Sequence, residues 1–445
     1  MVESADYQAK HARYVLTPWS AQAGLRPPVI VRAEGRFLYD AEGKRYLDFS
    51  SGLVAVNLGH AHPKMVRAIQ AQAERLCYVP PSFFNDARAE LAEALIQTAP
   101  WPGEEGRVFF TTGGAEANED AIKMARLITG RRKVLASYRS FHGSTAGAAT
   151  LTGDDRRFAA EPGIPEVVHF FAPYPYRSPF FAADPQEETR RALDHLETVL
   201  QFEGPERVAA IILEPAVGTN GVIIYPEGYL TGVRRIADRH QIILIFDEVM
   251  TGFGRTGAPF ASQRFAVTPD MITFAKGVTS AYVPLGGVMV RESLARHFDS
   301  NFLWCGHTFS GHPLAVAVAR TAQAIYREEG LFTRAQEIEG WLRPALEGFA
   351  RRHRVVGEAR GIGAFFALEL VRDQETREPL LFRYGGDPEV LRAFHTSLRG
   401  RGVYVFGRHN ILIVAPPLTI TREEVELGLE ALDASLGELS LKAAA

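Results

Sequence analysis

The sequence predicts an α/β protein in which one large unit is built on a mostly parallel sheet and a smaller unit is α+β. Across residues 63–330, short apolar runs alternate with helical stretches, the pattern of an open sheet covered by helices. The run 242–246, which precedes Asp247, is apolar at consecutive positions, so both faces of that strand are expected to be covered. With 445 residues the chain exceeds one ordinary core, which favours a second unit.

The strands of the large unit are predicted where apolar and β-branched residues run together: 108–111, 134–138, 167–171, 209–214, 242–247 and 271–274. The C-terminal pattern predicts helices at 334–352, 388–399 and 422–436 and strands at 355–360, 364–370 and 411–414. The strand region 30–40 is expected to join this C-terminal unit, because a lone hairpin is only marginally stable. We therefore divide the chain into an N-terminal arm with part of the small unit (1–62), a large unit (63–330) and a C-terminal small unit (331–445).

Composition excludes several classes of partner. A net charge of −3 gives no electrostatic reason to expect nucleic acid or an anionic membrane. The two cysteines, Cys77 and Cys305, are far apart and form no CxxC motif, so neither a disulfide framework nor a metal site is indicated. The N-terminal segment is charged and lacks the apolar core of a signal peptide, and no apolar run approaches the roughly twenty residues that span a bilayer. We expect a cytoplasmic protein.

A carboxylate is predicted at the carboxyl end of the strand 242–247. Ligands of parallel sheets bind at such ends, and Asp247 stands there. A buried acid is costly without a partner, so Asp247 is expected to face a cation, a metal or a protonated heterocycle. A helix N-cap or a buried ion pair is the structural alternative.

A lysine follows the next predicted strand. Lys276 comes just after the strand 271–274 and before Gly277. A lysine at a strand end, beside small residues and downstream of a strand-end acid, indicates amine chemistry on a carbonyl cofactor. A solvated surface lysine is the alternative.

A glycine turn supplies the third element. Residues 112–115 are expected to turn between the strand 108–111 and a helix that begins at Glu116. The backbone N–H groups of Gly113, Gly114 and Ala115, together with the positive end of the helix dipole, suit a phosphate. A lysine for an aldehyde, an acid for a ring nitrogen and amides for a phosphate are what pyridoxal phosphate requires. The large unit is therefore predicted to bind this cofactor.

These pieces resemble the class III pyridoxal-phosphate aminotransferases of fold type I, in their ω-amino acid or amine:pyruvate branch. The resemblance covers nearly the whole chain, through the motifs LDFSSGLVAVNLGHAHP, TTGGAEAN, YRSFHGST, LEPAVGTNGV, FDEVMTGFGRTG, AKGVTSAYVPLGG, GHTFSGHPLA and APPLTIT. Within that branch the sequence resembles taurine:pyruvate and β-alanine:pyruvate aminotransferases, whose turn is also rich in glycine. The resemblance implies transfer of an amino group from an ω-amino acid or primary amine to pyruvate, giving alanine. A class III relative with aminomutase activity of the glutamate-1-semialdehyde type, or with decarboxylating activity, is the alternative. A non-catalytic cofactor-binding protein is disfavoured by the intact Lys276 and Asp247.

The resemblance also assigns roles around the cofactor. Lys276 would bond to the aldehyde and then carry the proton during transfer, while Asp247 would hold the ring nitrogen protonated. Val249 and Phe141 would cover the two faces of the ring, with His142 as an orienting neighbour and Glu214 lining the site or pairing with a mobile arginine. Thr308 would reach the phosphate of a neighbouring subunit, so a homodimer, or a dimer of dimers, with sites at the subunit interface is implied. Many relatives carry hydroxyl residues where this chain has Gly113 and Ala115, so backbone amides must hold the phosphate.

The substrates implied are a small amine donor and a keto acid acceptor. By position, the walls of the substrate pocket are expected to be Trp19, Leu53, Val54, Phe83, Phe84 and Thr219. Arg408 lies where the family places an arginine that binds the carboxylate of pyruvate and moves away for amines. A solvated loop arginine is the alternative for Arg408.

Overall fold

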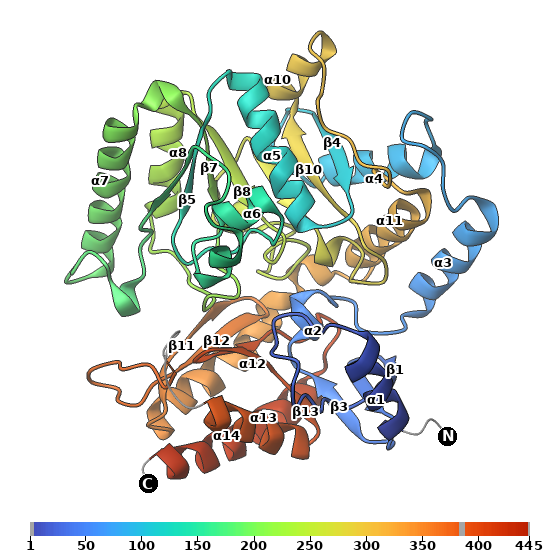
Figure 1. Cartoon of the computed structure of the whole chain (residues 1–445), viewed down its shortest axis with the longest axis vertical. Coiled ribbons are helices and arrows are strands. Elements are labelled where there is room, and N and C mark those ends of the chain that lie inside the picture. The colour runs from blue at the N-terminus through green and yellow to red at the C-terminus, as the bar shows by residue number, and fades with distance from the viewer. Residues whose placement is uncertain (1–3, 382–387, 444–445) are drawn as a thin grey trace.

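The computed structural model describes residues 4–381 and 388–443. A large α/β unit occupies the upper part of Figure 1, and a smaller unit below it combines the N-terminal and C-terminal segments. Within the described residues, none of the helices has the length and apolar character needed to cross a membrane.

The large unit is built on a seven-stranded sheet with the order β4-β10-β9-β8-β7-β5-β6. The strands are β4 Gly106–Thr111, β5 Lys133–Ser137, β6 Val167–Phe170, β7 Val208–Leu213, β8 Ile243–Asp247, β9 Met271–Phe274 and β10 Gly286–Arg291. The pairs from β6 to β9 are parallel, whereas β10 is antiparallel to both β4 and β9. The predicted mostly parallel sheet is confirmed.

The predicted strands lie within about two residues of the observed ones, but β10 was not predicted. Its first two residues are Gly286 and Gly287, which weaken the β-strand signal. Packing explains them, since a Cβ at Gly287 would lie 2.6 Å from the carbonyl oxygen of Phe109 and from Cζ of Phe274. The sheet therefore requires glycine where local propensity argues against a strand.

Helices cover both faces of this sheet, which explains its consecutive apolar residues. In β7, Ala210 and Ile212 pack with the helix α5 (Gly114–Thr129), whereas Ile211 and Leu213 pack with α7 (Pro185–Glu203) and α8 (Tyr229–His240). Figure 1 shows α5 on one side of the strands, with α7 and α8 on the left of the unit. The remaining helices are α3 Pro63–Arg75, α4 Asp86–Ile96, α6 Ala146–Leu151, α9 Ala261–Arg264, α10 Glu292–Ala295 and α11 Pro313–Glu328.

The small unit contains two four-stranded sheets, β1-β2-β3-β13 and β11-β12-β15-β14. The strands are β1 Ile30–Glu34, β2 Phe37–Asp40, β3 Arg45–Asp48, β11 Val356–Ile362, β12 Phe365–Leu370, β13 Val403–Tyr404, β14 Phe406–Arg408 and β15 Ile411–Val414. The helices are α1 Ser4–Tyr14, α2 Ser51–Val54, α12 Leu331–Arg352, α13 Pro388–Gly400 and α14 Arg422–Ala443. Because β13 pairs with β3, the N-terminal strands share a sheet with the C-terminal segment. The limits 1–62, 63–330 and 331–445 stay a proposed division.

Candidate active site

Asp247 and Lys276 meet at the carboxyl edge of the large sheet. Asp247 is the last residue of β8, and Lys276 opens a 3-10 turn (Lys276–Val278) that follows β9. Lys276 has a φ of 46°, a left-handed conformation that is costly outside glycine and often marks functional sites. Both residues line a cavity of about 490 Å³. Of the predicted site residues, this cavity also takes its lining from Trp19, Gly113, Gly114, Ala115, Phe141, His142, Glu214 and Val249.

The carboxylate of Asp247 is held by three neighbours. Its Oδ2 accepts a hydrogen bond from Asn118 Nδ2 at 2.8 Å and lies 2.8 Å from His142 Nδ1, and its Oδ1 accepts from the amide of Val249 at 3.0 Å. Asp247 is only 3% exposed. Among its described contacts there is no lysine or arginine ion pair, so the carboxylate can still take a cationic donor from the cavity.

Asn118 was missed by the sequence reasoning. Its Nδ2 also donates to the carbonyl of His142 at 2.7 Å, and its Oδ1 accepts from Thr273 Oγ1 at 2.7 Å. These bonds fix the amide between α5 and two neighbouring strands, where it orients the acid. A signal was present, because Asn118 lies four residues after Gly114 and therefore on the same face of the helix as the turn.

Burial sets the chemistry of Lys276. Removal from water lowers the pKa of its amine to about 8, although the carboxylates of Asp247 and Glu214 oppose the shift. A neutral amine is the nucleophile that attacks a carbonyl, so a lowered pKa increases the reactive fraction near neutral pH. The surface-lysine alternative does not describe this residue.

The phosphate end of the cavity is the start of α5. The helix begins at Gly114, two residues earlier than the predicted start at Glu116, and no side chain caps it. Glu116 instead accepts from the amide and hydroxyl of Thr112. The first-turn amides of Gly114 and Ala115 therefore have no partner within the helix and suit an oxyanion.

Two glycines keep this end compact. A Cβ at Gly114 would lie 2.8 Å from Cγ2 of Val249, so a larger residue would displace a side chain that lines the cavity. Gly143 has a φ of 142°, and a Cβ there would lie 2.5 Å from Cβ of Ala115. The YRSFHGST loop can approach the helix start only with glycine at this position.

Glu214 is buried beside Phe141. Its Oε1 accepts from the amide of Phe141 at 2.9 Å and its Oε2 from that of Gly218 at 2.8 Å. Burial raises the pKa of Glu214 to about 7, and the negative charge of Asp247 acts in the same direction. Glu214 is therefore a buried part of the cavity lining, as expected from the sequence.

An arginine that the sequence reasoning missed, Arg156, covers Phe141. Its guanidinium carbon lies 3.6 Å from the centre of the ring. Arg156 donates to Asp154 at 2.5 Å and to Thr219 Oγ1 at 2.8 Å. Asp154 also accepts from Arg408 Nη1 at 3.0 Å, so one buried acid holds two arginines at the border of the site.

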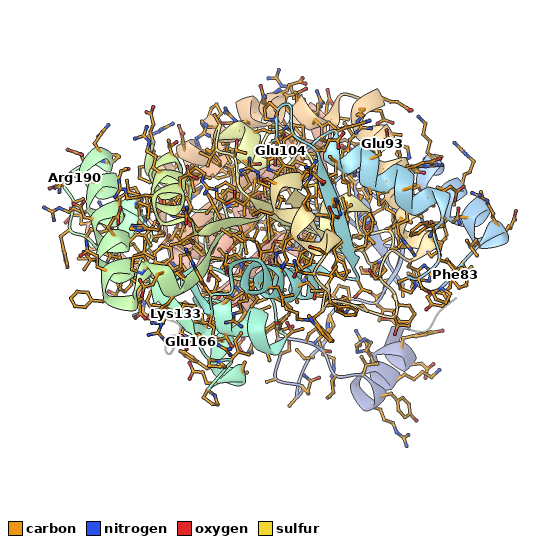
Figure 2. The ribbon with its side chains drawn as sticks, turned by 90° about the horizontal axis from the view of Figure 1, so that it is seen from above. Phe83, Glu93, Glu104, Lys133, Glu166 and Arg190 are labelled. Carbon is orange, nitrogen blue, oxygen red and sulfur yellow. The ribbon has the colours of Figure 1, made fainter. Side chains whose placement is uncertain are left out.

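Of the predicted substrate residues, Trp19 is the one found in the lining of this cavity. Trp19 lines it, with its ring 6.3 Å from that of Phe141. Leu53, Val54, Phe83, Phe84, Thr219 and Arg408 do not line it. Phe83 and Phe84 are exposed, and Figure 2 shows Phe83 at the margin of the molecule. Thr308 is exposed and its carbonyl accepts from the hydroxyl of Tyr78. Their roles in the site stay predictions.

The residues present fit pyridoxal phosphate. Gly114 and Ala115 would hold its phosphate, Asp247 its ring nitrogen, and Val249 and Phe141 its two faces, with Lys276 at its aldehyde. When bound, the cofactor supplies an electron sink for the negative charge that forms on the substrate carbon. The chain would supply the rest: Asp247 would keep a proton on the ring nitrogen, and the amine of Lys276 would take and return the proton of the substrate carbon.

Comparisons with known proteins agree with this geometry. The profile of the class III aminotransferase family matches residues 20–436. A probable gamma-aminobutyrate transaminase 2, mitochondrial, of Oryza sativa subsp. indica is 32% identical over 446 residues, which are 96% of this chain and 88% of the relative. A probable aminotransferase of Mycobacterium tuberculosis is 39% identical over 417 residues, 91% of this chain and 88% of the relative.

Solved structures agree as well. The taurine:2-oxoglutarate aminotransferase of Bifidobacterium kashiwanohense, in complex with PLP and glutamate, is 44% identical with a TM-score of 0.95, and the match covers 99% of both chains. A thermostable (S)-enantioselective omega-transaminase of Thermomicrobium roseum is 37% identical with a TM-score of 0.92, also over 99% of both chains. The chain belongs to the class III aminotransferases and is a pyridoxal-phosphate-dependent transaminase of fold type I.

Proposed function

We propose that this transaminase moves an amino group from an ω-amino acid or primary amine to pyruvate and forms alanine. The observation that carries the proposal is the position of Lys276, whose buried amine has a pKa near 8 and shares one cavity with the anchored Asp247. Lys276 takes a proton from the carbon next to the amine and returns it elsewhere, while Asp247 keeps the cofactor ring protonated, which together meet the central requirement of transamination.

The lining of the cavity supports a small donor. Beside the polar groups that serve the cofactor, the walls are apolar and aromatic, with Trp19, Phe141, Met250 and Leu285. Such a surface selects by size and shape and does not demand a particular charge on the donor. Taurine, β-alanine and simple primary amines therefore form the proposed donor class.

The acceptor is proposed from the arginines. Arg408 donates to Asp154 at 3.0 Å and to Asp155 at 2.5 Å, at the border of the site. We propose that it leaves this pair to bind the carboxylate of pyruvate bidentately and returns when an uncharged amine enters. A second acceptor, 2-oxoglutarate, is favoured by the solved structure that is 44% identical and was determined with glutamate.

A panel of donors with each acceptor tests the proposal. The purified enzyme should be yellow and should bleach when it receives donor without acceptor. Alanine should accumulate from pyruvate and glutamate from 2-oxoglutarate, and the ratio of their kcat/KM values identifies the acceptor. Turnover without any keto acid, or release of CO2, would instead support the aminomutase or decarboxylase alternative.

Arg408→Ala separates the acceptor role from the rest of the site. We expect the KM for pyruvate to rise by tens of fold, about 2 kcal/mol for a charged hydrogen bond, while the half-reaction of 1-phenylethylamine stays nearly unchanged. Arg392→Ala, at an exposed arginine of α13, is the matched control. Equal losses for both substrates, or none for pyruvate, would remove Arg408 from the carboxylate site.

We also propose a homodimer. Phe83, Phe84, Phe302 and Trp304 are large apolar side chains that are exposed on the single chain, and exposed apolar groups of this size often mark an interface. In the dimer, Thr308 would reach the phosphate in the partner's site. Light scattering should give twice the mass of the chain, and Thr308→Val should weaken cofactor retention. A monomer that retains full activity would overturn this part.

Cys77 and Cys305 are both free, which fits a reducing compartment such as the cytoplasm.

A further inference from the structure

A second and larger cavity, of about 750 Å³, lies outside the Lys276 cavity. Its lining comes from both units: Arg139 and Arg177 follow strands of the large sheet, whereas Glu369, Arg377 and His409 belong to the C-terminal segment. Its volume lies in the range of small-molecule sites. We call it the interdomain cavity.

The lining of the interdomain cavity is strongly basic. It contains four arginines, Arg139, Arg177, Arg377 and Arg408, together with His409, against two acids, Glu369 and Glu378. Glu369 is already engaged, because Arg177 Nε donates to it at 2.5 Å and Arg360 Nη2 lies 2.7 Å from it. Arg408 is engaged as well, by Asp154 and Asp155 outside the lining. Within the lining itself the arginines still outnumber the acids, which favours an anion.

One of these arginines has an unused donor. Arg177 binds Glu369 through Nε, but its Nη2 is buried and has no hydrogen-bond partner. A buried guanidinium donor without an acceptor is costly, because it has lost water and gained nothing in return. An oxyanion in the cavity could supply the acceptor after a small rotation of the side chain.

The backbone is strained at three of the residues that line the interdomain cavity. Arg139, Arg377 and His409 have φ values of 68°, 59° and 50°. Each is a long or bulky non-glycine residue in the left-handed region, where the backbone is strained. Such conformations collect where a side chain must be presented to a ligand, and three of them meet here, on separate segments.

We propose that the interdomain cavity binds a small metabolite with at least two anionic groups, such as a di- or tricarboxylate or a phosphate ester. Arginine forks bind carboxylate and phosphate oxygens bidentately, and opposing arginines from two units match a ligand charged at both ends. The interdomain cavity and the Lys276 cavity share no lining residue. Arg408 lines the interdomain cavity, and Asp154 holds it together with Arg156, which covers Phe141 of the Lys276 cavity. The inference rests on this cavity alone and does not require the proposed substrates.

The test uses the holoenzyme, so that the cofactor occupies the phosphate site of the Lys276 cavity. Citrate is titrated at constant ionic strength by calorimetry and by thermal unfolding, with sorbitol as an uncharged probe. We expect citrate to bind and to raise the unfolding temperature, with no effect of sorbitol. The proposal would be overturned if no binding were seen up to about 10 mM citrate, which corresponds to a binding free energy weaker than about 3 kcal/mol.

Paired variants locate the binding. Arg139→Gln with Arg377→Gln should weaken citrate binding at least about tenfold, the loss of one charged contact or more. The matched control, Arg392→Gln with Arg422→Gln, removes the same charge from exposed helical ion pairs and should leave the affinity unchanged. Equal affinity in the two double variants, or equal loss in both, would overturn the site.

Two single variants keep the test informative if a double variant folds poorly. Arg377→Gln changes an exposed side chain and should weaken binding by severalfold. Glu378→Gln removes a negative charge from the lining and should strengthen binding by severalfold. Changes of citrate affinity in opposite directions in these two variants would indicate electrostatic recognition in the cavity. A change in the same direction in both variants would contradict it.

Discussion

The Lys276 cavity and the interdomain cavity differ in how they are assembled. The first is built mainly at the carboxyl edge of one sheet, where the ends of β8 and β9 and the start of α5 supply Asp247, Lys276 and Gly114. The second is assembled from two units, where Arg139 and Arg377 of connecting segments, far apart in sequence, lie beside strand residues such as Glu369 of β12. Sheet geometry fixes the first arrangement, because parallel strands end at one edge.

This difference teaches where local sequence is informative. The strand that precedes an acid or lysine can be recognised in the sequence, and strand ends meet at one edge of the sheet, so the neighbours of such a residue can be predicted. A loop arginine has no such guide, because its neighbours depend on how the two units dock. The predictions below test how strictly the Lys276 cavity depends on individual strand ends and their supports.

Lys276→Ala should have the largest effect. Turnover should fall by at least ~1,000-fold, because the variant loses both the amine that bonds to the cofactor and the group that carries the proton. Cofactor should remain bound without a covalent link, which absorbance after borohydride treatment and denaturation can show. Lys133→Ala, at the opposite end of the sheet and paired with Glu203, is the control. Near-normal turnover in Lys276→Ala would refute the assignment.

Asp247→Asn should slow the donor half-reaction by about 100-fold and weaken cofactor retention, because the ring nitrogen loses its anion while the shape is kept. Stopped-flow absorbance and equilibrium dialysis measure the two effects. Glu248→Gln is a contrasting variant, since Glu248 points away and accepts from the amides of Ala261 and Ser262. It should lower stability and leave the cofactor spectrum unchanged. The same pattern in both variants would mean that Asp247 serves only structure.

Asn118→Leu should have a smaller effect, about tenfold on the half-reaction, because Asp247 keeps its contact with His142 but loses one hydrogen bond to its charge. The pH titration of the cofactor absorbance should shift as well, which simple destabilisation would not cause. Thr273→Val removes only the hydroxyl that orients the amide, and should change the same readouts less. An unshifted titration in Asn118→Leu would show that Asp247 is oriented without it.

Glu214→Gln should give the smallest effect, on the pH dependence of stability in the cofactor-free protein. The pKa of Glu214 is raised from 4.5 to about 7 by burial, so the folded state holds a proton that the unfolded state releases in this window. Its contribution to stability is full below about pH 4.5 and is lost as the pH rises through 7. The glutamine variant should lack this part of the decline. Identical unfolding temperatures of the two proteins across pH 4.5 to 7 would contradict it.

Much of the first cavity could be predicted from the sequence. The apolar run before Asp247, the strand before Lys276 and the glycine turn each have a local signature, and a sheet brings the ends of its strands together. The fold class followed from the same alternation of strands and helices. The strand β10 was missed because its glycines serve packing against Phe109 and Phe274, which local propensity does not reveal.

The sequence by itself determined the chemistry that the chain carries: an amine, an acid and a glycine-opened helix at strand ends. Only the tertiary structure decided how that chemistry is held. Asn118 orients Asp247, burial sets the pKa of Lys276, and Asp154 gathers Arg156 and Arg408 at one border. The reason is physical, since periodicity and turn signals act over a few residues. Desolvation and the pairing of charges depend on groups that folding brings together from hundreds of positions apart.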